Sequence, residues 1–387
     1  FIRKAYNKMV ENLTINKEFE HLPYREVERK FLPLFPEQLE ELRSRSQPVE
    51  QFYISHPNEP FMLRLREVLT ENGALQYTAT LKNRGDVTSN GLERLEIETD
   101  ISPELYLQYK TDDTPVLRKL RTTIGRYVAV DFFEDGRVLV ESENPIALTH
   151  FTDQYAAMLV DVTGDHQADN EWMAHLRYRQ NNQGVEALVP EKDSSPNEIV
   201  EEIVREYTKT PAVIVQIGGR SGSGKSTLVK AVAEQLQQYG LGVTILSTDD
   251  YHRGADWLRQ YNNGQEWTAW DDEIVYDIDS VVRDVGKLRS GQSVPKRMID
   301  FTTVEPVVVG EVAPAAVTII EGIYALSPRI TQCSSLRYEL PTPLATCAGR
   351  RILRDMQERP QFTPSENLRY VLEQAEPAYR NKRQIRP

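Results

Sequence analysis

A glycine-rich segment in the second half of the chain is the feature that most constrains its fold. Residues 219–226 read Gly-Arg-Ser-Gly-Ser-Gly-Lys-Ser and follow an apolar run at residues 213–217. Apolar residues then recur at helical spacing, at Leu228, Val229, Val232 and Leu236. Glycines between a buried strand and a helix let the loop's backbone N–H groups point inward, and the helix N-terminus adds partial positive charge. The segment therefore predicts a phosphate-binding loop in an α/β domain.

This loop also predicts where a nucleotide and its magnesium ion bind. We expect the Lys225 side chain to reach the β- and γ-phosphates and the Ser226 hydroxyl to ligate Mg²⁺. A chance glycine-rich turn is the alternative, and the strand before the loop and the helix after it both argue against that alternative. The residues expected to contact the nucleotide are Gly219, Ser221, Gly222, Ser223, Gly224, Lys225, Ser226 and Thr227.

Two further apolar runs, at residues 243–246 and 317–320, are typical of buried parallel strands. Asp249 and Asp250 follow the first run, and Glu321 follows the second. The carboxyl ends of parallel strands are where α/β sheets bind ligands. We therefore expect Mg²⁺ to be the partner of Glu321. Asp249 is a candidate site residue, whereas we interpret Asp250 as a helix cap or turn residue.

Basic residues crowd a helical stretch further along the chain. Two interpretations stay open, because such a stretch is either a solvated amphipathic face or a lid that brings guanidinium groups onto a transferring phosphate. The arginines concerned are Arg350, Arg351, Arg354 and Arg359.

The first half of the chain reads as short stretches of alternating polarity separated by turn residues. A short helix at residues 36–45, partly helical residues 151–178 and a polar linker at residues 181–196 complete this half. The eight expected strands are residues 26–31, 51–54, 61–67, 75–82, 92–99, 116–122, 127–133 and 138–143.

Charged side chains recur two residues apart on these expected strands, so each group shares one face. A half-solvated antiparallel sheet is one interpretation. A closed barrel whose lumen holds a polyanion and metal ions is the other, because like charges held close together repel unless something neutralises them. The groups are Glu26, Glu28 and Lys30; Arg64 and Arg66; Arg94, Glu96 and Glu98; Lys119 and Arg121; and Glu141 and Glu143.

Composition excludes several classes of protein. The 387 residues carry 46 Lys and Arg against 58 Asp and Glu, a net charge of −12, which argues against nucleic acid as a partner. No apolar run reaches about 18 residues, so we expect no membrane span in this segment. The two cysteines cannot build a disulfide framework, which favours a reducing, cytoplasmic location. The chain opens with Phe1 rather than Met, so we expect a fragment.

The charged strands carry a resemblance to a known family. Glu26-Val27-Glu28-Arg29-Lys30 matches the ExExK signature of the CYTH family, the triphosphate tunnel metalloenzymes. Further motifs follow in the family's order: Leu63-Arg64-Leu65-Arg66, Leu81-Lys82, Arg94-Leu95-Glu96-Ile97-Glu98, Leu117-Arg118-Lys119-Leu120-Arg121, Val130-Asp131, Glu141-Ser142-Glu143 and Val162-Thr163-Gly164-Asp165. The resemblance covers about residues 24–179 and implies an eight-stranded antiparallel tunnel that binds a triphosphate with Mg²⁺ or Mn²⁺.

The CYTH resemblance also implies roles for individual residues. Members of the family hydrolyse inorganic or thiamine triphosphate or cyclise ATP, and we favour hydrolysis as the commoner activity. The residues implied to bind triphosphate are Arg64, Arg66, Lys82, Arg94, Lys119 and Arg121. The residues implied to serve the metals are Glu26, Glu28, Asp131, Glu141 and Glu143, with Glu96 and Glu98 close by.

The second half resembles the uridine kinase and phosphoribulokinase family from about residue 212 to the end. The residues that carry this resemblance are the glycine-rich loop, Ser247-Thr248-Asp249, the stretch from Trp270-Asp271 to Asp277, residues 295–301, Ile320-Glu321-Gly322 and Arg350-Arg351-Ile352-Leu353-Arg354-Asp355. The resemblance implies that Asp249 is the general base, that Glu321 serves Mg²⁺ and that Asp277 contacts the acceptor. It also implies a lid formed by Arg351, Arg354 and Arg359, with Lys225 and these arginines acting in catalysis.

The chain departs from the uridine kinase pattern at three places. Ile299 stands where the family has a tyrosine, and Val304 and Glu305 occupy the region where it has a histidine. Pro360-Gln361 replaces the Gly-Arg that usually follows the lid motif. The first two departures remove groups that read a base, and the third weakens the lid. The chain also stops before the family's last strand, which again suggests truncation.

We therefore predict two domains: an antiparallel eight-stranded β tunnel (α+β), followed by an α/β P-loop NTPase fold with a parallel sheet. The expected bounds are residues 20–180 for the tunnel, 181–197 for the linker and 198–387 for the kinase domain. Plant tunnel enzymes fuse the same two modules in the opposite order.

The predicted function is ATP-dependent phosphoryl transfer to a small hydroxyl acceptor, beside a metal-dependent site for an inorganic or organic triphosphate. Expected cofactors are ATP and Mg²⁺, with Mn²⁺ as an option in the tunnel, and a homo-oligomer is left open. In one alternative the tunnel is the only catalyst, a triphosphatase or adenylate cyclase, and the P-loop domain is its nucleotide-binding regulator. In another, both domains are binding modules that sense nucleotide or polyphosphate.

Overall fold

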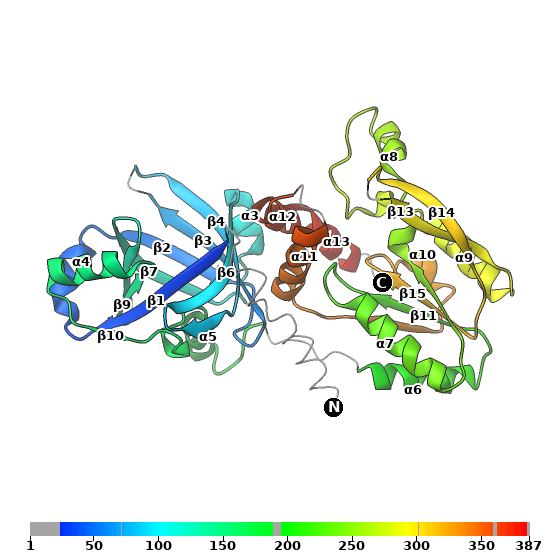
Figure 1. Cartoon of the computed structure of the whole chain (residues 1–387), viewed down its shortest axis with the longest axis horizontal. Coiled ribbons are helices and arrows are strands. Elements are labelled where there is room, and N and C mark those ends of the chain that lie inside the picture. The colour runs from blue at the N-terminus through cyan, green and yellow to red at the C-terminus, as the bar shows by residue number, and fades with distance from the viewer. Residues whose placement is uncertain (1–23, 71, 189–194, 301, 359–361, 385–387) are drawn as a thin grey trace. The chain divides into compact units, whose positions relative to one another are not determined.

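The computed structural model describes residues 24–70, 72–188, 195–300, 302–358 and 362–384. The chain divides into two compact units, Phe1–Val189 and Pro190–Pro387. Each unit has its own sheet, as Figure 1 shows. Each also has its own hydrophobic clusters. None of the described helices is long and apolar enough to cross a membrane.

The first unit is a closed antiparallel barrel of eight strands. Neighbouring strands run in the order β1-β9-β8-β7-β2-β3-β4-β6, and pairing of β6 with β1 closes the ring. Two short strands, β10 and β5, extend β1 and β6. The prediction of an eight-stranded tunnel is confirmed. The strands are β1 (Arg25–Pro33), β2 (Gln47–Tyr53), β3 (Phe61–Leu69), β4 (Leu75–Asn83), β5 (Asp86–Thr88), β6 (Gly91–Asp100), β7 (Val116–Ile124), β8 (Val128–Phe133), β9 (Val138–Ser142) and β10 (Leu159–Asp161).

Strand alternation places the apolar side chains of this barrel mainly on its outer wall, beneath helices. Val130 and Phe132 of β8 pack with Leu39 and Leu42, which lie just before β2, and with Phe151 of α4. Asp131 lies between them in the sequence and therefore points the other way. The helices of this unit are η1 (Pro36–Leu39), α2 (Glu40–Arg43), α3 (Pro103–Tyr109), α4 (Pro145–Tyr155), η2 (His166–Ala168) and α5 (Asn170–Asn181).

An apolar cluster closes part of the barrel interior. Leu117, Phe133 and Leu139 have the same strand parity as the inward-facing charges, and they pack against Met173 and Ala174 of α5. This burial holds α5 on the barrel and brings its N-terminus to the charged part of the interior, because Asp169 and Asn170 line the same cavity as those charges.

The second unit is built on a parallel sheet with strand order β12-β15-β11-β16. Its strands include the three apolar runs predicted as buried strands, so the predicted α/β fold is confirmed. A separate antiparallel pair, β13 and β14, was not predicted. The strands are β11 (Val213–Gly218), β12 (Val243–Ser247), β13 (Val294–Asp300), β14 (Glu305–Val312), β15 (Val317–Gly322) and β16 (Leu336–Glu339).

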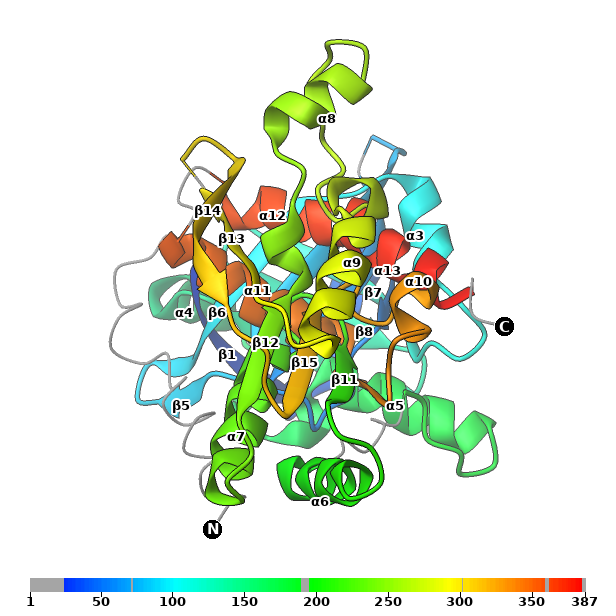
Figure 2. The same cartoon turned by 90° about the vertical axis from the view of Figure 1, so that its right-hand side faces the viewer.

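Helices cover both faces of the parallel sheet. Figure 2 shows α6, α7 and α9 around this sheet. Val213 and Val215 of β11 pack with α6 and α7, whereas Ile214 joins the cluster around α9. Every residue of β11 is buried, which is why it reads as a continuous apolar run rather than an alternating one. The helices are α6 (Pro196–Tyr207), α7 (Lys225–Gln238), η3 (Thr248–Tyr251), α8 (Ala255–Tyr261), η4 (Glu273–Val275), α9 (Ile278–Arg289), α10 (Pro328–Thr331), α11 (Leu344–Glu358), α12 (Pro364–Tyr370), the π-helical turn η5 (Val371–Ala375) and α13 (Glu376–Gln384).

Candidate active sites: a charged tunnel and a phosphate-binding loop

The barrel encloses a cavity of about 360 Å³ lined mainly by charged side chains. Carboxylates and basic groups contribute to this lining in similar number. The acidic residues are Glu26, Glu28, Glu96, Glu98, Glu141, Glu143 and Asp169, and the basic residues are Lys30, Arg64, Arg66, Lys82, Arg94, Arg121 and Arg126.

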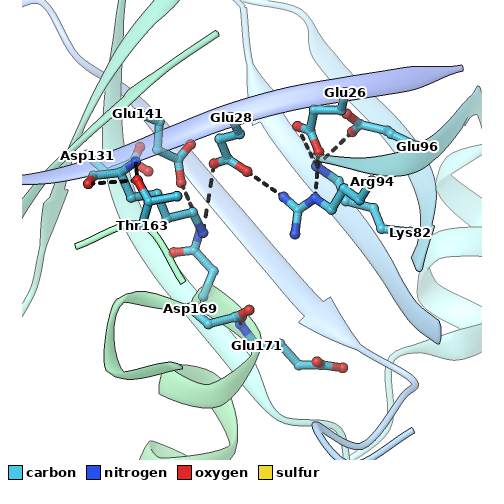
Figure 3. A network of polar contacts seen from close by, with 12 residues as sticks. Glu26, Glu28, Lys82, Arg94, Glu96, Asp131, Glu141, Thr163, Asp169 and Glu171 are labelled. Atoms are coloured by element: carbon cyan, nitrogen blue, oxygen red, sulfur yellow. Dashed lines mark hydrogen bonds and ion pairs between the residues drawn. The ribbon is translucent and has the colours of Figure 1, made fainter. Parts of the chain in front are cut away.

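Carboxylates of β1 are neutralised by basic groups of β4 and β6. Lys82 Nζ donates to Glu26 Oε1 at 2.8 Å, and Arg94 Nε donates to Glu26 Oε2 at 2.6 Å. Arg94 also bonds Glu28 through Nη2, so it lies between the two carboxylates (Figure 3). Although burial acts against its charge, Glu28 and Glu26 raise the pKa of Arg94. The pairing across strands removes the repulsion that the sequence pattern suggested.

A second ionic network lies on β7, β8 and β9. Lys119 Nζ donates to Asp131 Oδ2 at 2.6 Å, and Arg121 Nε donates to Asp131 Oδ1 at 2.6 Å. Arg121 also bonds Glu141. The side chains of Lys119 and Asp131 are fully buried and do not line the cavity, unlike Arg121 and Glu141. Burial, followed by the charge of Arg121, lowers the pKa of Lys119 to about 7.

Unlike Arg94 and Arg121, Arg66 has no carboxylate partner among the described residues. Arg64, by contrast, lies 3.5 Å from Glu98 and donates to Thr80 Oγ1 at 2.8 Å. The Nε atom of Arg66 is buried without a hydrogen-bond acceptor among the described residues. Burial and the charges of Arg64 and Arg121 lower the pKa of Arg66 to about 9. An anion in the cavity would stabilise this unpaired cation.

Carboxylates also gather near Glu143, an exposed residue that lines the cavity. Burial of the carboxyl group and the charges of Glu26, Glu96 and Glu28 raise the pKa of Glu143. Such a set of oxygen donors suits a hard divalent cation. Within the described residues, however, no three Asp, Glu, His or Cys side chains lie close enough together to hold a metal ion. The donor types therefore fit a metal, but the lysine and arginine bonds hold the carboxylates in another arrangement.

Asp169 and Asn170, at the start of α5, are among the cavity residues that the sequence analysis missed. Asn170 Nδ2 donates to Glu141 Oε1 at 3.3 Å. Although burial acts to raise the pKa of Asp169, the positive charge of Lys30 helps to lower it. Their only local signal is the Asp-Asn pair that begins a helix, which is typical of an ordinary N-cap.

The glycine-rich loop has the predicted form, with a strand before it and α7 after it. Gly224 is the N-cap of α7 with φ 95°, a left-handed conformation that favours glycine. A Cβ on Gly222 would lie 2.3 Å from the carbonyl oxygen of Cys347, so only glycine fits there. Lys225 is buried and donates from Nζ to the carbonyl oxygen of Arg220 at 2.8 Å. Ser221 and Ser223 belong to the loop, and Ser226 and Thr227 to the first turn of α7.

Three carboxylates lie at the ends of β12 and β15 beside this loop. Ser226 Oγ donates to Glu321 Oε2 at 3.4 Å. Burial and the charge of Asp249 raise the pKa of Glu321. Asp249 is exposed, whereas Asp250 is half-buried, and burial together with Asp249 and Glu321 raises the pKa of Asp250 to about 6. Asp250 is therefore not an isolated cap residue: Ser247 accepts the cap hydrogen bond of η3 instead.

The arginines expected to form a lid differ in their surroundings. Arg351 is buried, donates to both carboxylate oxygens of Asp271 at 3.2 and 3.1 Å and lies over the ring of Tyr370. Arg354 is half-exposed and donates to Asp355 at 2.9 Å. Arg359 lies outside the described residues. Arg350 was not selected as a site residue by the sequence analysis. Its Nη1 atom lies 3.7 Å from the position that a Cβ on Gly224 of the phosphate-binding loop would occupy.

Asp277, the residue implied to contact an acceptor, is the N-cap of α9. It accepts from Ser280 N at 3.2 Å and from Ser280 Oγ at 2.6 Å, and Arg253 lies 3.5 Å away. Asp271 bonds Arg351, whereas Asp277 caps a helix. The charge of Asp271 and that of Asp249 both act on Tyr276, whose pKa is raised by burial and by these two carboxylates.

Comparison with known proteins agrees with these features. The model of the phosphoribulokinase / uridine kinase family matches residues 214–381. The uridine kinase of Aeromonas hydrophila is 32% identical over 158 residues, which are 39% of this chain and 72% of that protein. The uridine kinase of Anoxybacillus flavithermus is 29% identical over 161 residues, which are 41% of this chain and 74% of that protein.

A plant protein is also similar. The inorganic pyrophosphatase TTM2 of Arabidopsis thaliana is 27% identical over 170 residues, which are 43% of this chain but only 23% of that protein. A putative fructose transport system kinase from Silicibacter is a solved structure with 21% identity and a TM-score of 0.43, covering 49% of this chain and 95% of its own.

The parallel sheet and its glycine-rich loop define a P-loop kinase domain. The closed barrel with inward charges has the form that the CYTH resemblance implies. The chain belongs to the phosphoribulokinase/uridine kinase family.

Proposed function

We propose that the second unit transfers the γ-phosphate of ATP to a hydroxyl group of a small acceptor. The observation that carries this proposal is the contact between Ser226 of the phosphate-binding loop and Glu321, next to the exposed Asp249. A phosphate cradle, a hard-cation site and an exposed carboxylate are the parts that phosphoryl transfer to an alcohol needs.

Each residue has a role in this proposal. Ser226 and Glu321 would hold Mg²⁺, which neutralises charge on the phosphates. Lys225 would exchange the Arg220 carbonyl for a phosphate oxygen. Asp249 would orient the acceptor hydroxyl and receive its proton. Arg354, with Arg351 and Arg359, remains the proposed source of positive charge for the transferring phosphate.

We propose Asp271 as an acceptor-binding residue beside Asp277. The electrostatic effect of both Asp249 and Asp271 on Tyr276 indicates that an acceptor near this ring would meet both carboxylates. Asp277 has its oxygens in a helix cap, and Asp271 bonds Arg351 and Tyr370, so each carboxylate would exchange such a partner for the acceptor.

An acceptor screen tests this function. The full chain is incubated with ATP and Mg²⁺ and a panel of nucleosides, sugars and small alcohols, and ADP release is followed. ADP release that depends on one acceptor supports the kinase. ADP release from no acceptor, together with normal ATP binding, would favour the alternative in which the P-loop unit is a nucleotide-binding regulator.

We predict that uridine and cytidine are poor acceptors. Ile299 lies in β13 and Val304 follows that strand, and neither side chain can hydrogen-bond a pyrimidine edge. A site without polar partners discriminates weakly among polar substrates. Steady-state assays should give kcat/KM below about 10⁴ M⁻¹s⁻¹ for both nucleosides. A higher value would contradict this prediction and restore the activity that the relatives' names describe.

We also propose that the first unit binds a triphosphate together with Mg²⁺ or Mn²⁺ and hydrolyses it. Arg66, which has no carboxylate partner among the described residues, lines this charged cavity and favours this second function. A triphosphate would take over the lysines and arginines that now hold the carboxylates. The carboxylates so released, Glu26, Glu28 and Glu141, would then be available to a divalent cation together with Glu143, and such a cation activates water when bound. Phosphate release from inorganic triphosphate with each metal tests this activity.

We predict that Arg66→Gln weakens tripolyphosphate binding without a loss of stability. Hydrogen bonds to charged groups contribute about 1.5–3 kcal/mol, so affinity should fall roughly 10- to 100-fold. No ion pair among the described residues is lost, and repulsion with Arg64 and Arg121 is reduced. Calorimetric titration with tripolyphosphate and urea unfolding are the measurements.

Arg118→Gln is the matched control for Arg66→Gln. Arg118 belongs to β7 but does not line the cavity, and it bonds Glu50 at 2.8 Å. It should keep its affinity for tripolyphosphate. Equal affinity in Arg66→Gln and the parent protein would show that the cavity does not use this cation.

A further inference from the structure

A continuous helical segment at the end of the described chain spans two loops of the P-loop unit. It comprises α12, the π-helical turn η5 and α13, with no break from Pro364 to Gln384. Tyr370, at the end of α12, donates from its hydroxyl to Asp271 Oδ2 at 2.8 Å. Glu376, at the start of α13, bonds Arg220 of the phosphate-binding loop. A π-helical turn lies between these two contacts, and such turns are frequent at functional sites.

The contact between Glu376 and Arg220 is bidentate and shielded from water. Arg220 Nε donates to Glu376 Oε2 at 2.7 Å, and Nη2 donates to Oε1 at 3.0 Å. Glu376 is only 2% exposed. The guanidinium lies 4.4 Å from the ring centroid of Tyr379, and its Nη1 donates to the carbonyl oxygen of Thr342 at 3.2 Å. Arg220 is thus fixed on several sides, unlike a surface ion pair, which contributes little.

The backbone of the same residue holds the loop's lysine. The carbonyl oxygen of Arg220 accepts a hydrogen bond from Lys225 Nζ at 2.8 Å and another from Ser223 N at 3.1 Å. Arg220 therefore bonds Glu376 of α13 through its side chain and bonds two residues of the phosphate-binding loop through its carbonyl oxygen. A displacement of Arg220 would move the acceptor of the Lys225 hydrogen bond.

We propose that Glu376 is a positioning residue that acts through Arg220 to keep the phosphate-binding loop in its nucleotide-binding conformation. The inference rests on the proposed binding of ATP at this loop. Removing one partner of a buried ion pair leaves the other charge uncompensated, so the remaining side chain rearranges. Because Arg220 is part of the loop, its rearrangement changes the loop as well, and nucleotide affinity reports the change.

Nucleotide binding by the full chain tests the proposal without a known acceptor. The parent protein, Glu376→Gln, Arg220→Lys and Arg380→Gln are titrated with ATP-Mg²⁺, and the urea midpoint of each is recorded. Glu376→Gln keeps the shape and a hydrogen bond but loses the charge. Arg220→Lys keeps the charge but loses the bidentate geometry. We expect ATP affinity to fall roughly 10- to 100-fold in both, the range found when a residue that orients a binding group is changed.

Arg380→Gln is the matched control because Arg380 bonds the same carboxylate at 2.9 Å from one turn further along α13. It should bind ATP within about twofold of the parent protein, since the Arg220 contact remains. A positioning role also predicts that the double variant Arg220→Lys/Glu376→Gln binds no more weakly than the weaker single variant.

The outcomes separate this inference from the proposed function. If the parent protein does not bind ATP, the function proposed for the P-loop unit fails. If the parent binds ATP and a folded Glu376→Gln binds it equally well, the positioning role is overturned. Should Glu376→Gln fail to fold, Arg220→Lys decides, because parent-like ATP affinity in that folded variant overturns the role too.

Discussion

The Asp249→Asn variant is expected to bind ATP normally while its kcat for phosphoryl transfer falls about 10²–10⁴-fold. Asparagine keeps the shape of the side chain and one hydrogen bond but cannot receive a proton. Asp249 is exposed at the end of β12, and its charge acts on Glu321 and on the buried Lys225. This position places its carboxylate near the phosphates that the loop is expected to hold. Steady-state kinetics with an identified acceptor, beside ATP titration, measure both quantities.

Two variants provide the comparison. Lys225→Ala should weaken ATP binding as well as turnover, because this side chain is expected to contact the phosphates directly. Asp250→Asn should lower kcat less than Asp249→Asn, since Asp250 is half-buried whereas Asp249 is exposed. A larger loss at Asp250 would assign the proton acceptor to that residue. Parent-like turnover in both aspartate variants would remove this strand end from the chemistry.

Local sequence patterns predicted the framework of both units. Alternating polarity with a period of two gave the inward face of the barrel strands, because that period is fixed by strand geometry. The glycine-rich loop was predictable because its glycines and the helix that follows are adjacent in the sequence. Gly224 adopts a left-handed conformation, which favours glycine, and α7 begins at Lys225. Neither pattern requires knowledge of distant residues.

Contacts between distant residues could not be predicted in this way. The bonds of Arg94 with Glu26 and Glu28 depend on the register of β1 against β6, which alternation alone does not define. Asp169 enters the cavity only because an apolar cluster holds α5 on the barrel. The hairpin of β13 and β14 has mostly exposed residues along β14, so burial gives it no periodic signal.

The sequence pattern around Arg351 did not indicate which residues surround its side chain. Its place among clustered arginines suggested either a solvated face or a lid. The structure buries it against Asp271 and Tyr370, and although burial opposes the charge, Asp271 raises its pKa. A solvated face is therefore excluded for Arg351 itself. The sequence could not indicate this because Asp271 is 80 residues away.

The Glu28→Gln and Glu141→Gln variants are expected to lose metal-dependent triphosphate hydrolysis, by at least about 10- to 100-fold. Each change removes one charged oxygen donor that the proposed metal would use. On the sequence pattern alone, removing one of several like charges would preserve or raise stability. The structure reverses this expectation, because Glu28 bonds Arg94 and Glu141 bonds Arg121. Loss of one charged hydrogen-bond partner should lower the free energy of unfolding by about 1–3 kcal/mol.

A control carboxylate outside the cavity separates the loss of stability from the loss of activity. Glu50 of β2 does not line the cavity, yet it is held in a similar way by Lys110, Arg118 and Tyr106. Glu50→Gln should therefore lower the unfolding free energy comparably while triphosphate hydrolysis stays near the parent rate. Phosphate release with Mg²⁺ and Mn²⁺ and urea unfolding are measured for all three variants. If Glu28→Gln and Glu141→Gln hydrolyse triphosphate as fast as Glu50→Gln does, these carboxylates serve the barrel's stability and not its metals.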